Sequence, residues 1–475
     1  MSENLYINGE WVEPANGKYY PSYNPATHEV VGEVADGREE DMKKAIEAAD
    51  AAFEEWAGLT ALERADYLMK CYDKMKERQD ELAELMTKEQ GKPLHEAKAE
   101  VNGAADFFRW FAEEARRVYG ETIPASAKNK RIKVIKQPVG VVVAITPWNF
   151  PQTMVTRKVA PALAAGCPVI VKPAKQTPLN AVALFKIFDE VGLPKGVVNL
   201  ITTDKSSTIS NEMFSNEKVR KITFTGSTEV GKMLTREAAN QMKRVSMELG
   251  GHSPFIVFED ADLDKAIEGV MQSKFRNAGQ TCVCANRVYV QKSIQKEFEQ
   301  KFIEKVQKLK VGNGLEEGVQ IGPLIDGAAV KKQIEQVEDA VSKGAKVIIG
   351  GNQTGSQGSF YEPTILSNVK DDMKITHEET FGPIAPVITF ETEEEVIQRA
   401  NNVKYGLAAY YYTQDFSRSI RVQEKLDYGV IGLNDALPAV PQAPFGGMKE
   451  SGVGREGGHQ GLDDFLETKY ISMQI

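Results

Sequence analysis

The chain has 475 residues, of which 42% are hydrophobic and 26% charged, and its formal net charge is -9. This length predicts roughly two to four domains, and the acidic balance argues against a nucleic-acid partner, because phosphate binding needs basic patches. With four cysteines, no secretory leader pattern and no run of about 18 apolar residues, we expect a reduced, cytoplasmic protein without a membrane span.

The first part of the chain predicts short strands followed by a helical layer. Turn signals at Asn8-Gly9 and Asn16-Gly17 divide the strand-like stretch between Asn4 and Tyr23. Apolar residues then recur at helical spacing. We expect three long amphipathic helices, at Glu39–Trp56, Leu62–Lys88 and Glu96–Tyr119.

The middle of the chain alternates short apolar strands with helices, after one mostly polar strand at Arg131–Lys136. The expected strands are Val139–Ile145, Val169–Lys172, Val197–Ile201, Lys221–Phe224 and Arg244–Glu248. The expected helices between them are Thr156–Ala165, Leu179–Val191, Ser207–Phe214 and Thr228–Gln241. This order predicts an α/β fold with a parallel, doubly wound sheet.

A second alternation predicts another α/β domain. Its expected strands are Pro254–Phe258, Arg287–Gln291, Lys346–Ile349, Ile384–Phe390, Leu407–Tyr412 and Gly429–Leu433. Its expected helices are Asp262–Asn277, Ile294–Leu309, Ala328–Lys343, Glu393–Ala400 and Phe416–Leu426. Two sheets that meet near Glu248–Gly251 predict a ligand cleft at their junction. The terminal segment Lys469–Ile475 alternates like a half-buried strand, and we expect another subunit to supply its partner edge.

Two thiols, Cys282 and Cys284, follow the loop residues Gly279, Gln280 and Thr281. Such a bend favours a position at a cavity, where a thiol can act as a nucleophile. Free cysteines are more often buried packing residues, so both interpretations stay open at this level. The pair supplies only two metal ligands and no neighbouring His or Cys completes a set, so we predict no metal site.

Two features at strand ends point to an anionic ligand. Gly226 and Ser227 lie on a strand-to-helix turn, whose free N–H groups either face an anion or simply form the turn. Lys172 and Lys175 end a strand of the same sheet, where ligands of doubly wound folds bind. If a dinucleotide binds, they can reach a ribose hydroxyl and a 2'-phosphate, respectively; otherwise they are solvated charges.

Two further side chains are candidates for catalysis. Glu248 ends a strand and precedes two glycines, so burial would raise its pKa and suit it to general base catalysis. Its alternative role is a surface carboxylate or a helix cap. Asn149 lies between Pro147 and Pro151, in a rigid loop that either aims its amide or only packs.

Together these motifs resemble the NAD(P)-dependent aldehyde dehydrogenase superfamily, over essentially the whole chain and in the expected order. Within it, the cysteine loop and Met448–Gly452 look most like the succinate-semialdehyde dehydrogenase branch. The motifs are Pro147-Trp148-Asn149-Phe150-Pro151, Lys172-Pro173-Ala174, Phe224-Thr225-Gly226-Ser227, Met247-Glu248-Leu249-Gly250-Gly251, Gly279-Gln280-Thr281-Cys282, Glu379-Thr380-Phe381-Gly382-Pro383 and Pro444-Phe445-Gly446-Gly447.

The resemblance implies an aldehyde dehydrogenase fold with three parts. These are a Rossmann-like cofactor domain (residues 1–120 and 139–250), an α/β catalytic domain (251–450) and a small β oligomerisation arm (121–138 and 451–475). The arm implies a homodimer or homotetramer.

The resemblance also implies a mechanism. Cys282 attacks the aldehyde in a site that favours the thiolate, Asn149 holds the oxyanion with the backbone N–H of Cys282, and Glu248 activates water to hydrolyse the thioester. The cofactor would be bound by Trp148, Lys172, Lys175, Gly226, Ser227, Glu379 and Phe381.

Departures from the family pattern bear on cofactor and substrate. Lys175 stands where NAD-using members commonly carry a glutamate, so we expect NADP to be preferred and NAD to be an alternative. Arg157 and Arg276 match arginines that bind the substrate carboxylate, and guanidinium groups suit that role. Ala439 replaces an expected serine, which weakens the case for succinate semialdehyde over another aldehyde.

Two alternatives accompany this interpretation. A CoA-acylating dehydrogenase would not need the water-activating Glu248, and intact Cys282, Glu248 and Asn149 argue against a catalytically silent protein. Relatives with the Cys-x-Cys arrangement can close a reversible disulfide, so Cys284 is either a redox partner of Cys282 or a packing residue.

Overall fold

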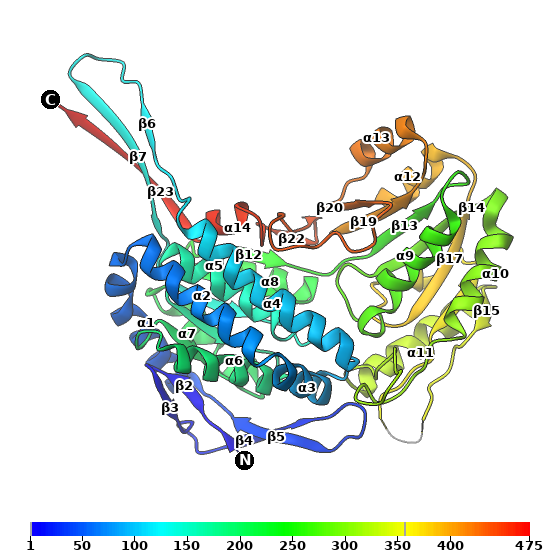
Figure 1. Cartoon of the computed structure of the whole chain (residues 1–475), viewed down its shortest axis with the longest axis horizontal. Helices are drawn as coiled ribbons and strands as arrows, with labels where there is room; N and C mark the ends of the chain where they lie inside the picture. The colour runs from blue at the N-terminus through cyan, green and yellow to red at the C-terminus, as the bar shows by residue number, and fades with distance from the viewer. Residues whose placement is uncertain (1, 356–357) are drawn as a thin grey trace.

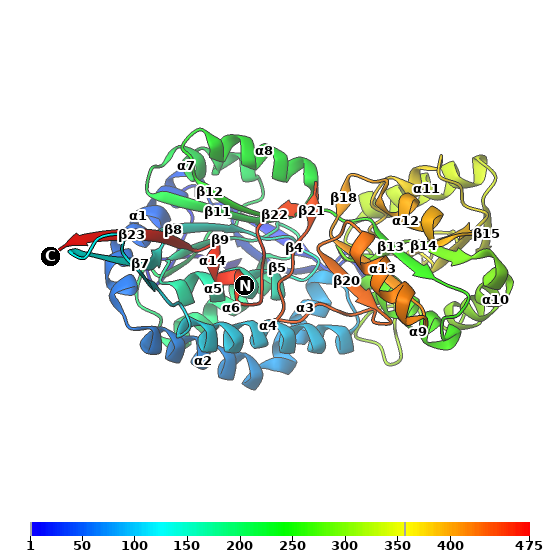
Figure 2. The ribbon, with the colours of Figure 1, turned by 90° about the horizontal axis from the view of Figure 1, so that it is seen from above.

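The computed structural model describes residues 2–355 and 358–475. They form two lobes and an arm that projects away from both (Figure 1). The view from above in Figure 2 separates the same two lobes, with the arm strands extending beyond the first. Within the described ranges, no helix is both long enough and apolar enough to cross a bilayer.

The first lobe is built on an eight-stranded sheet with the order β22-β12-β11-β8-β9-β10-β2-β3. Its parallel core consists of β12 (Arg244–Glu248), β11 (Val219–Thr225), β8 (Val141–Ile145), β9 (Val169–Lys172) and β10 (Val198–Leu200). The strands β2 (Leu5–Ile7), β3 (Glu10–Val12) and β22 (Gly452–Val453) add antiparallel edges. The predicted doubly wound parallel sheet is therefore confirmed.

Helices cover both faces of this sheet (Figure 1). They include α1 (Glu39–Gly58), α5 (Thr153–Ala165), α6 (Pro178–Val191), α7 (Ser210–Ser215) and α8 (Thr228–Ala239), with the short 3-10 turn η1 (Ser206–Thr208) before α7. An outer layer is formed by α2 (Ala61–Glu77), α3 (Gln79–Gln90) and α4 (Leu94–Ala115). A small sheet, β1 (Ser2–Glu3), β5 (Val30–Ala35) and β4 (Tyr19–Tyr23), completes the N-terminal part.

The expected single helix Leu62–Lys88 is wrong, because the chain breaks between α2 and α3. Arg78 leaves the helical conformation, with φ -101° and ψ 19°. Its guanidinium forms ion pairs with Glu81, at 2.7 Å, and with Glu190 of α6, at 2.6 Å. Arginine is a good helix former, so local propensity gives no signal for this break.

The second lobe contains a seven-stranded sheet with the order β15-β16-β17-β14-β13-β19-β20. Its strands are β15 (Lys346–Ile349), β16 (Thr364–Ser367), β17 (Ile384–Phe390), β14 (Ala285–Gln291), β13 (Ser253–Val257), β19 (Ala408–Tyr412) and β20 (Val430–Leu433). Its main helices are α9 (Leu263–Phe275), α10 (Gln295–Val306), α11 (Gly327–Ser342), α12 (Glu393–Asn401) and α13 (Phe416–Lys425). The four-residue strand β16 was not predicted, since its short apolar pattern has no clear period.

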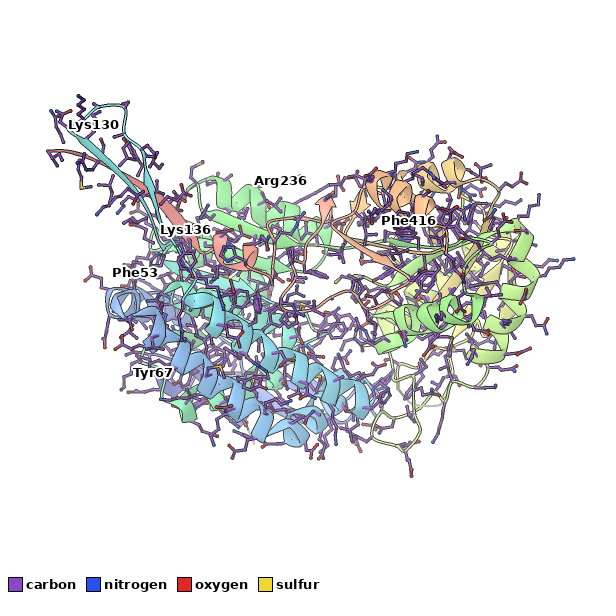
Figure 3. The ribbon with its side chains drawn as sticks, turned by 45° about the horizontal axis from the view of Figure 1, so that its top comes forward. Phe53, Tyr67, Lys130, Lys136, Arg236 and Phe416 are labelled. Carbon is purple, nitrogen blue, oxygen red and sulfur yellow. The ribbon has the colours of Figure 1, made fainter. Side chains whose placement is uncertain are left out.

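The arm is a three-stranded sheet with the order β23-β7-β6. It consists of β6 (Glu121–Ile123), β7 (Lys130–Pro138) and β23 (Leu466–Gln474). Figure 3 shows Lys130 near the tip of the arm and Lys136 near its base. The terminal strand pairs antiparallel with β7 of the same chain. The expectation that another subunit supplies its partner edge is therefore wrong for this edge, and the other edge of β23 has no partner strand among the described residues.

The segment between residue 451 and the arm packs on the first lobe. The strand β22 pairs with β12, and the short helix α14 (Gln460–Asp463) contacts α5. Leu462, Phe465 and Leu466 belong to the hydrophobic core of that lobe. The arm proper thus begins near Leu466, later than the expected boundary at residue 451.

Candidate active site

Two cavities meet at Cys282 and Met154, between the lobes. The first, of about 270 Å³, is lined by Trp148, Asn149, Gly226, Ser227, Glu379 and Phe381, among others. The second, of about 330 Å³, is lined by Phe150, Arg157, Arg276, Val283, Ala439 and Phe445, among others. A thiol shared by two cavities can contact two different ligands, one from each side.

The loop that carries Cys282 is bent by three consecutive left-handed residues. After α9, the short 3-10 turn η2 (Arg276–Gly279) contains Asn277, Ala278 and Gly279 at φ 51°, 53° and 76°. A side chain at Gly279 would meet the carbonyl oxygen of Gly382 at 2.2 Å, so glycine is required there. The predicted bend therefore exists, and it delivers Cys282 to the cavities.

Burial dominates the electrostatics of the Cys282 thiol. It raises the pKa of Cys282 to about 12, and the carboxylates of Glu379 and Glu248 add to the rise while Arg157 and Arg276 oppose it. In the protein without ligands, desolvation outweighs the effect of the two arginines on this pKa. That the site favours the thiolate during catalysis stays a prediction.

Glu248 is buried at the end of β12, with an exposed fraction of 3%. Neither carboxylate oxygen has a hydrogen-bond partner among the described residues. Burial, followed by the nearby carboxylate of Glu456, raises its pKa well above the usual range. The side chain abuts Gly446, where an added Cβ would lie 2.9 Å from Oε1, and it is not part of the lining of either cavity.

Asn149 is held in place by both its side chain and its backbone. Its Nδ2 donates to the carbonyl oxygen of Gln280 at 3.0 Å, two residues before Cys282. Its Oδ1 has no partner in the described part of the chain. The amide therefore lies beside the nucleophile loop, at the wall of the first cavity.

Arg157 lines the second cavity, but its charge already has a partner. Its Nε lies 2.5 Å from Oε2 of Glu456, in an ion pair without good hydrogen-bond geometry. Lys158 also contacts Glu456, and the guanidinium of Arg157 lies over the ring of Phe445, 4.4 Å from its centroid.

Arg276 lies in the same cavity and differs from Arg157 in its surroundings. It is half-buried, and within residues 2–355 and 358–475 it has no acidic side chain at ion-pair distance. Its guanidinium lies 5.4 Å from the ring centroid of Phe150. Glu96 and Ala439 are part of the same lining. Burial raises the pKa of Glu96, and Arg276 is among the groups that oppose the rise. The cavity thus contains a guanidinium without a direct ion pair and a small apolar residue where a hydroxyl was expected.

The first cavity brings together the residues expected to hold a nicotinamide. The rings of Trp148 and Phe381 pack edge to face, with centroids 5.5 Å apart. Glu379 accepts a hydrogen bond from the backbone N–H of Gly251 at 2.9 Å, and burial raises its pKa to about 7. A carboxylate beside such a pocket suits the paired hydroxyls of a ribose.

Gly226 and Ser227 form the turn from β11 into α8. Ser227 is the N-cap of α8, with its hydroxyl accepting from the backbone N–H of Val230. The backbone N–H of Gly226 donates to the carbonyl oxygen of Glu248 at 3.0 Å. The remaining N–H groups of the first helical turn face an anion-binding position, which fits a pyrophosphate.

Lys172 and Lys175 lie at the carboxyl end of β9, outside the two cavities. Burial and the nearby charge of Lys175 lower the pKa of Lys172 to about 8. Lys175 is exposed and pairs with Asp204 at 3.3 Å. The two ammonium groups are thus on the expected strand, and the ion pair of Lys175 is one that solvent screens strongly.

Cys284 is fully buried and lines neither cavity. The ammonium of Lys274 lies 3.3 Å from its Sγ and 3.0 Å from Oδ1 of Asn286. In the folded loop its thiol therefore contacts a buried lysine, while the thiol of Cys282 faces the cavities. A disulfide between the two stays a prediction that requires this loop to rearrange.

Sequence reasoning missed several residues of this site. Glu456 pairs with Arg157 and Lys158, and it was assigned to the arm because it follows residue 451. Its only sequence signal is the Gly454-Arg455-Glu456-Gly457-Gly458 run, where glycines allow close approach. Met154, shared by both cavities, has no distinguishing signal in the sequence.

Comparison with known proteins decides the family. The model of the aldehyde dehydrogenase family matches residues 11–471. The chain belongs to the aldehyde dehydrogenase family. Its aldehyde dehydrogenase fold is shown as well, because the crystal structure of an aldehyde dehydrogenase from Brucella melitensis biovar abortus superimposes with a TM-score of 0.98 at 53% identity, covering 99% of this chain and 97% of that one.

Among curated aldehyde dehydrogenases, the chain is similar to enzymes of two named activities. It is 53% identical to the glutarate-semialdehyde dehydrogenase of Pseudomonas putida, covering 100% of this chain and 98% of that protein. It is 52% identical to the NADP(+) succinate-semialdehyde dehydrogenase of Escherichia coli, covering 99% of this chain and 97% of that protein. The predicted NAD(P)-dependent aldehyde dehydrogenase is confirmed at the level of the family.

Proposed function

We propose that the protein oxidises an aldehyde bearing a terminal carboxylate, with succinate semialdehyde as the first candidate, to the corresponding dicarboxylate. The observation that carries this proposal is Arg276, a guanidinium without a direct ion pair in the cavity that also contains Cys282. A guanidinium without an acidic partner favours a ligand that supplies the carboxylate. Relatives named for succinate and glutarate semialdehyde support the same class.

Glutarate semialdehyde is the second candidate. Ala439 gives the cavity a small apolar residue in place of a hydroxyl donor. One additional methylene therefore meets less obstruction there. The two substrates differ by a single CH₂, which is worth about 1–3 kcal/mol of discrimination in an apolar pocket.

Three residues would carry the chemistry. Cys282 attacks the aldehyde carbon, and the oxyanion of the resulting thiohemiacetal lies between the Asn149 amide and the backbone N–H of Cys282. A bound nicotinamide supplies the hydride acceptor for conversion to the thioester. Glu248 then turns from its position against Gly446 and takes a proton from the water that releases the acid.

NADP is the cofactor that we propose as preferred, with NAD as an alternative. In the first cavity, Trp148, Glu379 and Phe381 would hold the nicotinamide half, and Gly226 and Ser227 would bind the pyrophosphate. Lys172 and Lys175 would contact the adenosine ribose and its 2'-phosphate. A 2'-phosphate competes with Asp204 for Lys175 and carries more charge than a single carboxylate.

The domain functions follow from this placement. We assign cofactor binding to residues 1–120 and 139–250 and catalysis to residues 251–450. We also propose a cytoplasmic homodimer or homotetramer. The unpaired edges of β23 in the arm and of β20 in the second lobe support assembly, because exposed sheet edges pair readily with another chain.

The test is a panel of aldehydes assayed by the absorbance of the reduced nicotinamide, with NAD and with NADP. We expect the highest kcat/KM for a carboxylated aldehyde with NADP. Arg276→Ala should raise KM for succinate semialdehyde at least about tenfold and change KM for the neutral aldehyde of equal length less than about threefold, because the neutral aldehyde has no carboxylate for the guanidinium to bind.

Cys282→Ser is the inactive control for this panel. If Arg276→Ala raises KM equally for the charged and the neutral aldehyde, the proposed substrate class is wrong. If kcat/KM is higher with NAD than with NADP, the proposed cofactor preference is wrong.

A further inference from the structure

A buried polar cluster joins the two lobes beneath the active site, and the proposed reaction does not use it. Lys92 follows α3, and its side chain has an exposed fraction of 0%. Asn277, in the turn that leads to Cys282, has an exposed fraction of 1%. Buried polar groups need partners, so the partners of these two side chains indicate what they hold.

Both side chains donate to the same atom, the backbone carbonyl oxygen of Asn149. The ammonium of Lys92 lies 2.9 Å from it, and Nδ2 of Asn277 also lies 2.9 Å from it. The first donor comes from the first lobe, and the second comes from the segment that carries Cys282. We call this arrangement the carbonyl clamp.

Further contacts fix each donor of the clamp. Lys92 is paired with Glu100, and its ammonium lies 3.9 Å from the ring centroid of Phe150. Glu100 in turn accepts from the backbone N–H groups of Gln152 and Thr153, at 3.1 and 3.2 Å. The same carboxylate therefore anchors Lys92 and the start of α5, immediately after the Asn149 loop.

Asn277 is fixed from both sides despite its left-handed backbone. Its backbone N–H donates to Glu96 at 2.8 Å, and its Oδ1 accepts from Gln90 at 3.0 Å. Its Nδ2 also lies 3.3 Å from the carbonyl oxygen of Gln280, the same oxygen that accepts from the side chain of Asn149. A left-handed non-glycine residue persists only when its surroundings determine it.

We propose that Lys92 and Asn277 are positioning residues that set the spacing of the two oxyanion donors. One donor is the amide of Asn149, and the other is the backbone N–H of Cys282. They belong to different lobes, and the clamp ties the backbone of the first to the loop of the second. This inference rests on the proposed function, because it assumes that an oxyanion forms at Cys282.

The test uses two variants and a matched control. Asn277→Gly keeps the left-handed backbone accessible and removes the carboxamide. Lys92→Met with Glu100→Gln removes the ammonium without leaving an unpaired buried carboxylate. Lys243→Met is the control, because Lys243 is also a buried lysine that donates to backbone carbonyls, those of Asn216 and Val219, but lies outside both cavities.

Two reactions of Cys282 distinguish a misplaced oxyanion donor from a general loss of thiol reactivity. Acylation by a 4-nitrophenyl ester forms an oxyanion, whereas alkylation by iodoacetamide does not. We expect both variants to lose at least about tenfold in kcat and in ester acylation, since one oxyanion donor is worth about 10²–10³ in kcat. The alkylation rate of both variants should change less than about threefold, because the thiol remains. KM should also change less than about threefold in Asn277→Gly, because Asn277 lines neither cavity, whereas Glu100 lines the second cavity.

Lys243→Met should lower thermal stability and leave kcat and ester acylation unchanged. The inference is overturned if Asn277→Gly folds and keeps kcat and ester acylation within about twofold of the wild type. It is also overturned if alkylation falls as much as acylation. If the double variant does not fold, Asn277→Gly alone decides. If the ester acylates Cys282 of the wild type but the wild type oxidises no carboxylated aldehyde, the proposed substrate is refuted. The ester assay then still decides whether the clamp positions the oxyanion donors.

Discussion

At the scale of single residues, the state of the nucleophile is the feature that the folded environment changes most. Cys282 lies where two cavities meet, and burial raises the pKa of its thiol. The raised pKa of Glu248 has the same main cause, desolvation. Without ligands, desolvation therefore opposes ionisation of both the nucleophile and the base.

This state predicts the pH dependence of Cys282 alkylation. With a pKa of about 12, the thiolate fraction and the iodoacetamide rate should rise about tenfold per pH unit between about pH 7 and pH 9. The rate of activity loss measures this, with Cys284→Ala as the background for other thiol reactions. A plateau inside this range would show that the thiol ionises much more easily than its burial indicates.

The sequence was sufficient to identify residues that line the two cavities, but not the side chains that pair with them. The bend before Cys282 and the Ser227 turn are local features, so residue spacing revealed them. The pairing of Arg157 with Glu456 joins α5 to the C-terminal segment, and no local pattern encodes it. For the same reason, Lys92 was not recognised.

At the scale of elements, α6 begins without a cap from its own sequence. Thr177 makes no side-chain cap, and Glu89 of α3 takes its place. The carboxylate accepts from the backbone N–H groups of Leu179 and Asn180, at 2.8 and 3.0 Å, and from Ser22 at 2.8 Å. Burial nevertheless outweighs these hydrogen bonds and raises the pKa of Glu89 to about 7.

This cap predicts a pH-dependent difference between the wild type and Glu89→Gln. Because the folded-state pKa lies above the unfolded value of 4.5, the contribution of Glu89 to stability is fully present below about pH 4.5 and is lost as pH rises to about 7. The loss is at most about 3 kcal/mol. Glutamine does not titrate, so the Tm of Glu89→Gln minus that of the wild type should rise by roughly 1–3 °C from about pH 5 to about pH 8.

Glu84→Gln is the control for this comparison. Glu84 lies on the same helix, and its side chain is exposed beside Lys88. Its Tm difference from the wild type should stay nearly constant across the same pH range. A constant difference for Glu89→Gln as well would mean that the buried carboxyl keeps its usual pKa.

Elements were predicted best where hydrophobic period and local geometry agree. The strands β9, β12, β15 and β17 begin and end at the predicted residues. The misjudged elements lack a local signal: the break at Arg78 coincides with its ion pair to Glu190 of α6, and the partner of β23 is β7, more than three hundred residues earlier in the chain. Side-chain period identifies a strand, but it does not identify its neighbour.

At the scale of the whole molecule, the arm is a sheet whose exposed face and outer edges are not covered by other described residues of the same chain. It projects from the first lobe with both outer edges free (Figure 1). Tyr470 on β23 has an exposed fraction of 60%, and Ile123 on β6 one of 40%. Both side chains lie on one face of the arm sheet. Ile123 pairs with Ile132, which pairs with Ser472, and Tyr470 shares the face of Ser472 because it is two residues away on the same strand. Three strands usually need a packed face for stability, so a second copy of the chain is the cover that we propose.

Tyr470→Glu should therefore weaken assembly. A carboxylate on this face would have to be desolvated in the assembled protein, which costs several kcal/mol unless it is paired. We expect the wild type to have the mass of a dimer or tetramer by light scattering, and the variant to dissociate at protein concentrations at least about tenfold higher. Tyr23→Glu is the matched control, because Tyr23 has an exposed fraction of 53% on the small sheet away from the arm. A monomeric wild type, or equal dissociation of the two variants, would assign the exposed face of the arm to a role other than assembly.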